Sequence, residues 1–595
     1  MNLEGRISSL AGSLTPPVAR QQRTGACWAA EGSGHPPRRV PAKGLRYGKD
    51  RPQQGRPVSA IRSKGTALAG LSVRGLGRAF TEGFAQGFGF SAALAALLCC
   101  SSCQPEMAYS APDHAVDRYF SEMHDADATR QHFSSQSHIL PPLPTYFPSL
   151  PNISLPDTKQ ATLPNGLRIF LLEDHEVPIV HGTLLMRGGQ RASPSNKVGV
   201  AGISAQVQRS GGTQQLPGAQ LDEALERRAA SIESGAAGES VTFGFECLSE
   251  DTGDVMGLLA DLVLRPAMPQ RKLDFFRSQV LNVLEHINDD ASVIPRRELS
   301  QLLYGRGSVY SRRPTPNQIQ NLKMQDLKDF LARWERPDNT IFGISGDFDA
   351  GEMTELVEQK FGEWRPAPGQ PQDVPQIPAT PLADPSDYAG KAFLVDRPGQ
   401  TQYNVALGEI GISLKDPDVY ALDVLNDLLN SFGGRLFDQI RSREGLAYSV
   451  SGSWSSTPID HPGLFMGGGE TANIADFLRL LKTAFQRVIE DGFTDAEINM
   501  AKEQTLNGFV FNFASTEKQL ARACIYALLD IPQDYLFTYK AGIEAVTKDD
   551  ILQAARRHLH PEQQAIVVAG DRILLEQSLS RQGQPFEALD ISFRD

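Results

Sequence analysis

The sequence predicts an α+β protein whose body is one structural unit used twice. Strand-like segments such as residues 241–247 alternate with longer helical patterns such as residues 269–287. A Pro-rich stretch at residues 365–391 divides the body, and the order of elements then repeats. Each half closes on a hydrophobic strand that ends in Gly-Asp, at residues 341–347 and 565–571, which indicates internal duplication.

The composition of the chain and the positions of its Pro-rich segments and turns predict its domain organisation. With 595 residues, 41% hydrophobic and 22% charged, the chain has the composition of a folded protein with several domains. The first half opens with a turn on Asn165-Gly166 that leads into a strand. The predicted segments are a targeting region (1–111), a Pro/Ser-rich linker (112–156), an N-terminal half (157–364), a Pro-rich linker (365–391), a C-terminal half (392–577) and a tail (578–595).

Charge is distributed unevenly along the chain. Residues 1–80 contain 14 Lys or Arg and three acids, which gives a net charge of +11. Because the whole chain has a net charge of −12, the remaining residues have a net charge of −23. A basic stretch rich in Arg, Ser, Gly and Pro is typical of an organelle transit peptide. The alternative is a basic tail that binds nucleic acid. The acidic body, which has no basic patch interleaved with aromatic residues, argues against it, and we expect no nucleic-acid partner.

An apolar run of 13 residues, 88–100, follows the basic stretch. It is shorter than the roughly 20 residues that span a bilayer, so we expect no stable transmembrane anchor in the mature chain. Two interpretations stay open: a second, thylakoid-lumen signal with small residues at 108–110 as its cleavage site, or a segment inside a simple transit peptide. The expected location is the chloroplast, in the stroma or the thylakoid lumen, with the mitochondrion as the alternative.

Six short motifs carry the most specific signal in the body. They are Leu163-Pro-Asn-Gly-Leu167, Arg187-Gly-Gly189, Gly199-Val-Ala201, Ser210-Gly-Gly-Thr213, Arg336-Pro-Asp-Asn339 and Gly445-Leu-Ala-Tyr-Ser449. In order and spacing they resemble the pitrilysin/insulinase family of zinc peptidases, closest to its short branch, which is like mitochondrial processing peptidase. The likeness runs from about residue 163 to residue 571 and implies two homologous halves in a clamshell. Each half would contain two α/β domains, with a sheet backed by helices.

Active members of that family bind zinc with the helical motif H-x-x-E-H. Two His at i and i+4 lie on one helix face and ligate Zn²⁺, and the Glu between them activates the bound water. Aligned on Gly199-Val-Ala201, the motif falls on Gly202, Ala205 and Gln206. Gly and Ala have no ligating side chain and Gln is a poor neutral ligand for zinc.

The third ligand in the family is a Glu on a later helix, which falls near Glu285, with Val283 also close to the expected spacing. One carboxylate cannot hold a catalytic zinc, and Glu285 is expected to be a solvated or salt-bridged residue. We therefore expect no metal bound by this chain.

Active members also use an Arg and a Tyr, seven positions apart in the second half, and this pattern matches Arg441 and Tyr448. A guanidinium and a phenol can donate hydrogen bonds to the scissile carbonyl as it gains negative charge. The structural alternative is that Tyr448 is packed and that Arg441 forms a salt bridge to Glu444 or Asp438.

The resemblance implies the non-catalytic subunit of a heteromeric zinc metallopeptidase, inactive alone. It would bind peptide substrates and supply Arg441 and Tyr448 to a zinc-bearing paralogue, and the zinc is expected in that partner. The short Gly-rich segment at residues 431–434 does not match the long loop that captures presequences in processing peptidase. Two alternatives stay open: a structural core subunit, as in the respiratory bc complex, and an autonomous metalloendopeptidase.

Overall fold

The computed structural model describes residues 158–593 apart from Pro378, Phe432, residues 459–460, Ala514 and residues 580–585. The predicted targeting region and first linker lie outside the described residues, and so does the sequence on which the expected location rests. Within the described part, no helix has both the length and the apolar character needed to span a bilayer.

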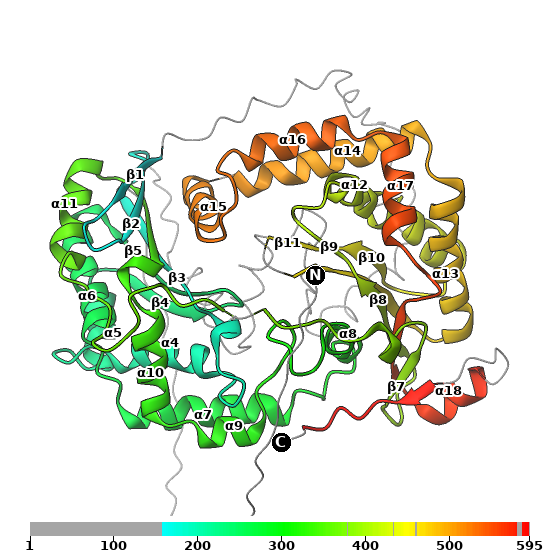
Figure 1. Ribbon diagram of the computed structural model, residues 1–595, viewed down its shortest axis with the longest axis horizontal. Coiled ribbons are helices and arrows are strands. Elements are labelled where there is room, and N and C mark those ends of the chain that lie inside the picture. The colour runs from blue at the N-terminus through cyan, green and yellow to red at the C-terminus, as the bar shows by residue number, and fades with distance from the viewer. Residues whose placement is uncertain are drawn as a thin grey trace, which may run out of the picture. The chain divides into compact units, whose positions relative to one another are not determined.

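The first half contains six strands: β1 (Lys159–Thr162), β2 (Arg168–Glu173), β3 (Ile179–Arg187), β4 (Ser231–Ala236), β5 (Ser240–Leu248) and β6 (Thr340–Gly346). They form one mixed sheet in the order β1-β2-β6-β3-β5-β4 (Figure 1). β6 enters the middle of the sheet, parallel to β2 and antiparallel to β3. All of its residues are buried, which explains its continuous apolar sequence.

The second half repeats this plan. Its strands are β7 (Ala392–Asp396), β8 (Tyr403–Ile410), β9 (Ile412–Ser413), β10 (Val450–Trp454), β11 (Ser456–Thr457), β12 (Leu464–Thr471), β13 (Ala565–Gly570) and β14 (Phe586–Ala588). The sheet order is β10-β12-β8-β13-β7-β14, and β13 is parallel to β7 and antiparallel to β8, as β6 is to β2 and β3. The predicted α+β class and the two halves, each with a sheet backed by helices, are confirmed.

One detail of the predicted fold needs correction. Each half has a single six-stranded sheet, so it holds one α/β domain rather than two. The physical reason is the position of the closing strand. β6 inserts between β2 and β3, and β13 inserts between β7 and β8, so each closing strand joins its neighbours into one continuous six-stranded sheet. In the second half, β9 and β11 form a separate two-stranded parallel sheet.

The helices surround both sheets. Those of the first half are α4 (Val200–Gly211), α5 (Gly218–Glu226), α6 (Thr252–Leu264), α7 (Gln270–Glu285), α8 (Ile294–Tyr304), α9 (Pro316–Asn321), α10 (Met324–Trp334) and α11 (Ala350–Phe361). Those of the second half are α12 (Val419–Asn430), α13 (Ile474–Asp491), α14 (Asp495–Val510), α15 (Thr516–Leu528), α16 (Tyr535–Ala545), α17 (Lys548–His558) and α18 (Arg572–Leu579).

One helix of each half packs on the sheet of the other half. Leu299 and Leu303 of α8 pack in one cluster with Val567 of β13, on the second sheet. In return, α15 packs through side chains such as Leu520 on the first sheet, where Ile341 belongs to the same cluster. The buried faces of α8 and α15 therefore join the two halves through apolar contact.

Part of the predicted tail is an edge strand. β14 pairs in parallel with β7, and the Leu394 carbonyl accepts a hydrogen bond from the amide of Leu589 at 2.7 Å. Beyond it, Asp590 accepts from Arg306 through its carbonyl at 3.2 Å, and the Arg313 guanidinium lies 5.6 Å from the ring of Phe593. β14 thus occupies in the second sheet the place that β1 has in the first.

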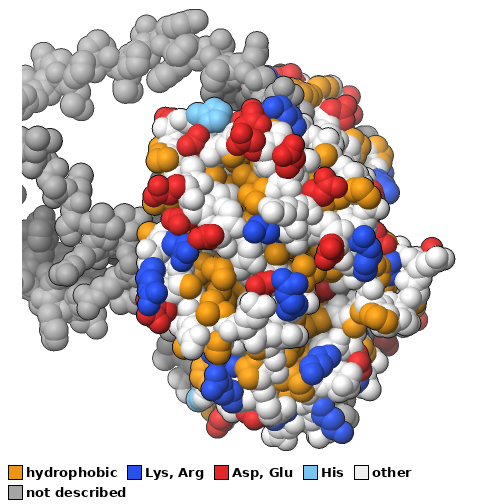
Figure 2. All heavy atoms as spheres, turned by 90° about the vertical axis from the view of Figure 1, so that its left-hand side faces the viewer, with side chains coloured by type: hydrophobic (Ala, Val, Ile, Leu, Met, Phe, Trp, Pro, Cys, Tyr) orange, Lys and Arg blue, Asp and Glu red, His pale blue; other side chains and the backbone are white. Residues whose placement is uncertain are grey.

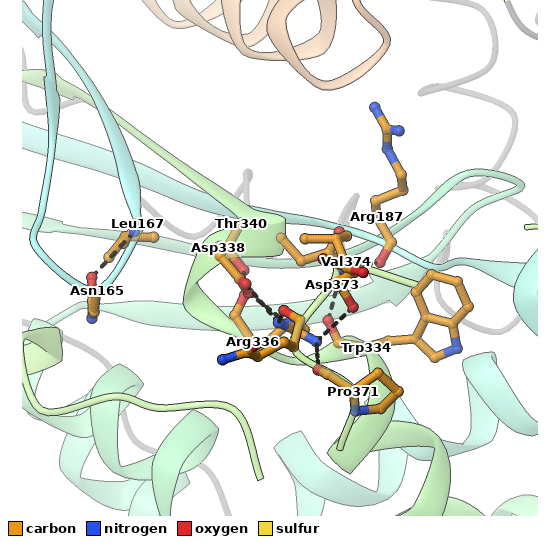
Figure 3. Close-up of polar contacts among 12 residues, drawn as sticks. Asn165, Leu167, Arg187, Trp334, Arg336, Asp338, Thr340, Pro371, Asp373 and Val374 are labelled. Atoms are coloured by element: carbon orange, nitrogen blue, oxygen red, sulfur yellow. Dashed lines mark hydrogen bonds and ion pairs between the residues drawn. The ribbon is translucent and has the colours of Figure 1, made fainter. Parts of the chain in front are cut away.

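Arg336 holds the linker between the halves (Figure 3). This buried side chain pairs with Asp338 at 2.6 Å and donates to the carbonyls of Pro371 at 2.9 Å, Gln372 at 2.7 Å and Asp373 at 3.2 Å. The Arg-Pro-Asp-Asn motif therefore has a structural role in this chain, since the guanidinium binds a loop backbone that has no partner strand.

Candidate functional site

Helix α4 carries the three positions at which the resemblance expects metal-binding and catalytic groups. Ala205 is buried, whereas Gly202 and Gln206 are partly exposed and, four residues apart, lie on one face of the helix. A Cβ atom added at Gly202 would lie 2.8 Å from Nε2 of Gln190, so this amide fills the space beside the glycine. The residues present do not fit a catalytic zinc, which needs three protein ligands.

Gln206 is bonded to the neighbouring strand. Its Nε2 donates to the carbonyl of Ser234 at 3.1 Å, and Oγ of Ser234 donates to the carbonyl of Ala205 at 2.9 Å. Arg209, one turn further along α4, donates from Nε to the carbonyl of Ile232. The side chain at the second His position of the motif therefore acts as a hydrogen-bond donor to the edge of β4.

The position of the third ligand does not complete a metal site. Glu285 is the last residue of α7 and is exposed, as expected for a solvated residue, and Val283 is 40% exposed. Neither residue belongs to a group of His, Cys, Asp or Glu side chains that come together in the described part of the chain.

One such group does occur there, formed by Asp416, Asp418 and His558. Asp418 accepts two hydrogen bonds from Arg557, at 2.6 and 2.7 Å, and lies 2.8 Å from Nε2 of His558. These contacts join the start of α12 to the end of α17. They hold the pKa of Asp418 below its usual value, chiefly through Arg557, so the group is explained as an ion-pair network.

The fold brings Arg441 and Tyr448 together. Arg441 lies in a π-helical turn, Phe437–Arg443, and Tyr448 follows a tight turn in which Gly445 has a φ of 62°. The guanidinium carbon of Arg441 lies 4.8 Å from the ring centroid of Phe437 and 5.0 Å from that of Tyr448. The cation is therefore stacked against two aromatic rings, which orients it while leaving its N–H groups able to donate.

The contacts of Arg441 and Tyr448 differ from those of the structural alternative, in which Tyr448 is packed and Arg441 forms a salt bridge. Tyr448 is 73% exposed rather than packed. Asp438 pairs with Arg443 at 2.6 Å, and Arg441 forms no ion pair with any described residue. A stacked guanidinium beside an exposed phenol can donate hydrogen bonds to a peptide carbonyl.

The strand that follows Tyr448 has a closed edge. Asn426 of α12 donates to the carbonyl of Trp454 at 2.9 Å and accepts from its N–H at 2.8 Å. Asn430 makes the same two bonds with Gly452, at 3.0 and 2.9 Å. Sequence reasoning missed these residues, although two Asn four positions apart in the apolar sequence of α12 are a signal for buried hydrogen bonding.

β4, the corresponding edge strand of the first sheet, is only half closed. Ala237 donates to the carbonyl of Ser240 at 2.8 Å, so ladder alternation directs the backbone groups of Ile232 and Ser234 away from β5. Their carbonyls accept from α4, as described above. Within the described residues their N–H groups have no acceptor, so this edge retains outward donors.

Two carboxyl groups near α4 and on α12, those of Glu335 and Asp427, have raised pKa values. Burial raises the pKa of Glu335 to about 8, although Gln208 of α4 donates to its Oε2 at 3.0 Å and partly opposes the shift. Burial also raises the pKa of Asp427 on α12 to about 6, opposed by a hydrogen bond from Thr505. Both groups lie among helices, and neither belongs to a group of metal-type side chains among the described residues.

The fold and α4 together define a class of protein, a duplicated α+β unit of the zinc-peptidase type whose metal helix lacks its ligands. Residues 168–311 match the family model of insulinase (peptidase family M16), and residues 321–505 match that of the peptidase M16 inactive domain. The two matches cover more than half of the chain, which belongs to the M16 peptidase family.

Individual relatives are distant. The Bacillus subtilis protein named uncharacterized zinc protease YmxG is 24% identical over 370 residues, which cover 61% of this chain and 86% of the relative. The Helicobacter pylori non-peptidase homolog YmxG is 24% identical over 399 residues, 65% of this chain and 88% of the relative. A crystal structure of a peptidase M16 inactive domain from Pseudomonas fluorescens has a TM-score of 0.61 at 22% identity, and covers 70% of this chain and 98% of that one.

Proposed function

We propose that this chain is the non-catalytic subunit of a heteromeric zinc metallopeptidase of the short, processing-peptidase-like branch. The observation that carries the proposal is the state of Arg441, whose guanidinium lies over the rings of Phe437 and of the exposed Tyr448 and has no ion pair among the described residues. A merely structural Arg would be expected to pair with a nearby acid. Zinc is supplied by a partner paralogue, since Gly202 and Ala205 offer no ligand.

The chemistry of the pair suits a shared active site. As water attacks a peptide carbonyl, negative charge develops on its oxygen, and donors aimed at that oxygen stabilise the transition state. Arg441 supplies charged N–H donors and Tyr448 supplies a hydroxyl. Removing one such donor typically costs about 10²–10³ in kcat.

β4 is the strand that we propose for peptide binding. An extended peptide adds to a sheet edge through main-chain hydrogen bonds. The outward N–H groups of Ile232 and Ser234 can donate to peptide carbonyls, whereas Asn426 and Asn430 already occupy the outer edge of β10. The two sheets of the duplicated fold thus have different roles.

Peptide is the class of partner that the surface favours over nucleic acid. On the face shown in Figure 2, Lys and Arg side chains are interspersed with Asp and Glu and form no continuous basic stripe. Nucleic-acid binding depends on clustered positive charge that replaces counterions on phosphates.

Co-purification of the mature chain with its partner is the decisive test. We expect a partner with an intact H-x-x-E-H helix, and peptidase activity only in the complex. In that complex Arg441→Ala and Tyr448→Phe should each lower kcat/KM by about 10²-fold, while Arg443→Ala, whose exposed side chain pairs with Asp438, should not. Unchanged activity in both variants would establish the structural-subunit alternative instead. Chelator-sensitive cleavage by the chain alone, with one tightly bound zinc, would establish an autonomous peptidase.

A further inference from the structure

The outer edge of β1 is open. β1 is the outermost strand of the first sheet and pairs with β2 (Figure 1). Leu163 donates to the carbonyl of Leu167 at 2.9 Å, so ladder alternation directs the backbone groups of Gln160 and Thr162 away from β2. Among the described residues these groups have no partner, and both residues are exposed. The edge therefore presents unpaired N–H and carbonyl groups to solvent.

A cavity of about 320 Å³ opens to solvent beside this edge. Four polar residues contribute to its lining, together with the buried Phe170: Gln160, Thr162, Arg168 and Gln533. In the ladder Gln160 is paired with Phe170, and Thr162 with Arg168. Directly paired residues share a face, and Phe170 packs with α15, so the cavity lies on the face that α15 covers. Its volume is near the lower end of the range of about 300–1,000 Å³ for ligand pockets, which suits a side chain.

Arg168 brings a half-buried positive charge to the cavity. Its Nη1 donates to the carbonyl of Ala527, which also lines the cavity, at 3.2 Å. Among the described residues Arg168 forms no ion pair, and the nearby Asp530 pairs with Arg187 instead, at 3.4 Å. Burial lowers the pKa of Arg168, Asp530 opposes this shift and Arg187 adds to it.

The charges around Arg168 do not cancel. Two guanidinium groups and one carboxylate meet at the end of α15. The C-terminus of a helix contributes only about −0.5 of an elementary charge, so a positive charge remains beside the cavity. A carboxylate is the group that best complements a guanidinium in charge and in shape.

We propose that the open edge of β1 binds an extended segment of a partner protein, whose Asp or Glu side chain enters the cavity and pairs with Arg168. Main-chain hydrogen bonds to Gln160 and Thr162 hold the segment. A residue opposite either of them projects its side chain to the cavity face, because directly paired residues share a face.

The occupant is a partner segment rather than the substrate peptide. β1 and β4 are the two edges of one six-stranded sheet, so five strand spacings of about 4.8 Å, roughly 24 Å, separate them. A peptide aligned on β4 does not reach β1. The inference goes beyond the proposed function and does not depend on Arg441 or Tyr448.

The test measures binding of three fluorescein-labelled nonapeptides of Thr, Ser and Val to the full chain, by fluorescence anisotropy. The first has a central Glu and the second a central Gln. The third is the Glu peptide with N-methyl groups two residues before and two after the Glu, where the N–H groups point to the same edge as that of Glu. We expect the first to bind about tenfold more tightly than either of the others, since the second lacks the charge and the third lacks main-chain donors.

Two variants separate the edge from the cation. Gln160→Pro removes an outward N–H and no ladder bond, and should weaken binding of the Glu and Gln peptides alike, by about tenfold. Arg168→Gln should abolish the preference for Glu over Gln. Because Arg168 also binds the Ala527 carbonyl, Gln160→Pro keeps the test valid if Arg168→Gln fails to fold. The matched control is Arg227→Gln on α5, an exposed residue paired with Glu223, which should change neither property.

Equal binding of the Glu and Gln peptides, or a preference that persists in Arg168→Gln, would overturn the role of Arg168. Ser234→Pro removes an outward N–H from β4 in the same way. Loss of binding in Ser234→Pro but not in Gln160→Pro would place the peptides on β4, which overturns the β1 site and supports the proposed function. Absence of binding by all three peptides would overturn the β1 site, whereas the proposed role of Arg441 and Tyr448 is tested separately by kcat/KM.

Discussion

Gln206 donates a hydrogen bond from Nε2 to the carbonyl oxygen of Ser234, at 3.1 Å, from the helix position where active relatives place a zinc-binding His. At this position, which holds a metal ligand in active relatives, the side chain instead connects α4 to the edge of the first sheet through a hydrogen bond. Loss of the metal site and gain of this link therefore concern the same side chain.

The link should contribute to stability. Gln206→Ala is expected to lower the free energy of unfolding by about 1 kcal/mol, because a hydrogen bond to the partly buried Ser234 carbonyl is lost. Urea unfolding followed by circular dichroism measures the change. Gln220→Ala, an exposed position on α5, is the control and should have almost no effect. Equal effects of the two variants would mean that the contact with Ser234 contributes nothing.

Substitution of Arg441 or Tyr448 should have little effect on the stability of the fold. Tyr448 is 73% exposed, so Tyr448→Phe is expected to change the free energy of unfolding by less than about 0.5 kcal/mol. Arg441→Ala removes the stacking on Phe437 and Tyr448 and should cost at most about 1 kcal/mol. Thermal unfolding checks both values. A loss several times larger would favour a structural role for the pair.

Asn426 should be far more important for stability than its exposed counterparts. Asn426→Ala leaves both backbone groups of Trp454 without partners in a buried position, and we expect a loss of about 2–4 kcal/mol. Asn282→Ala on the exposed face of α7 is the matched control. If hydrogen exchange at the Trp454 amide were as fast in the wild-type chain as in Asn426→Ala, closure of the β10 edge by this side chain would be refuted.

Stability should depend on pH through Glu335. Its pKa is raised to about 8 by burial, so between pH 5 and pH 8 the folded chain holds a proton that the unfolded chain releases. Stability therefore falls as pH rises through this window, by at most about 1.4 kcal/mol per pH unit.

Glu335→Gln should remove that contribution, so that the variant is more stable than the wild type at pH 8 and similar to it at pH 5. Unfolding temperatures at the two pH values measure the effect. The exposed Glu355→Gln on α11 should retain the wild-type dependence. An identical pH profile for Glu335→Gln and the wild type would show that Glu335 titrates normally.

Local sequence patterns predicted the elements better than their assembly. The closing strands at residues 341–347 and 565–571 are recognisable because each is buried on both faces and reads as an apolar run. The single sheet in each half was not predicted, because the insertion of β6 between β2 and β3 depends on pairing between residues far apart in the chain. The strand β14 was missed for a different reason, because a strand of three residues has too little periodicity to be recognised in the sequence.

The identity of the side chains on α4 was determined by the sequence alone. Whatever the fold, Gly202 and Ala205 have no side-chain atom that can ligate zinc, and this follows from covalent structure. The match of Arg441 and Tyr448 to the family pattern was also visible in the sequence, and the fold places the two side chains in contact.

Tertiary structure alone decided which polar groups find partners. Asn426 closes the edge of β10 and Gln206 binds β4. The local sequence does not identify these partners, although the apolar sequence around Asn426 indicates that this side chain is buried. Burial and hydrogen bonding depend on contacts between distant segments. The sequence identifies which chemistry a residue can perform, and packing determines whether the group is free to perform it.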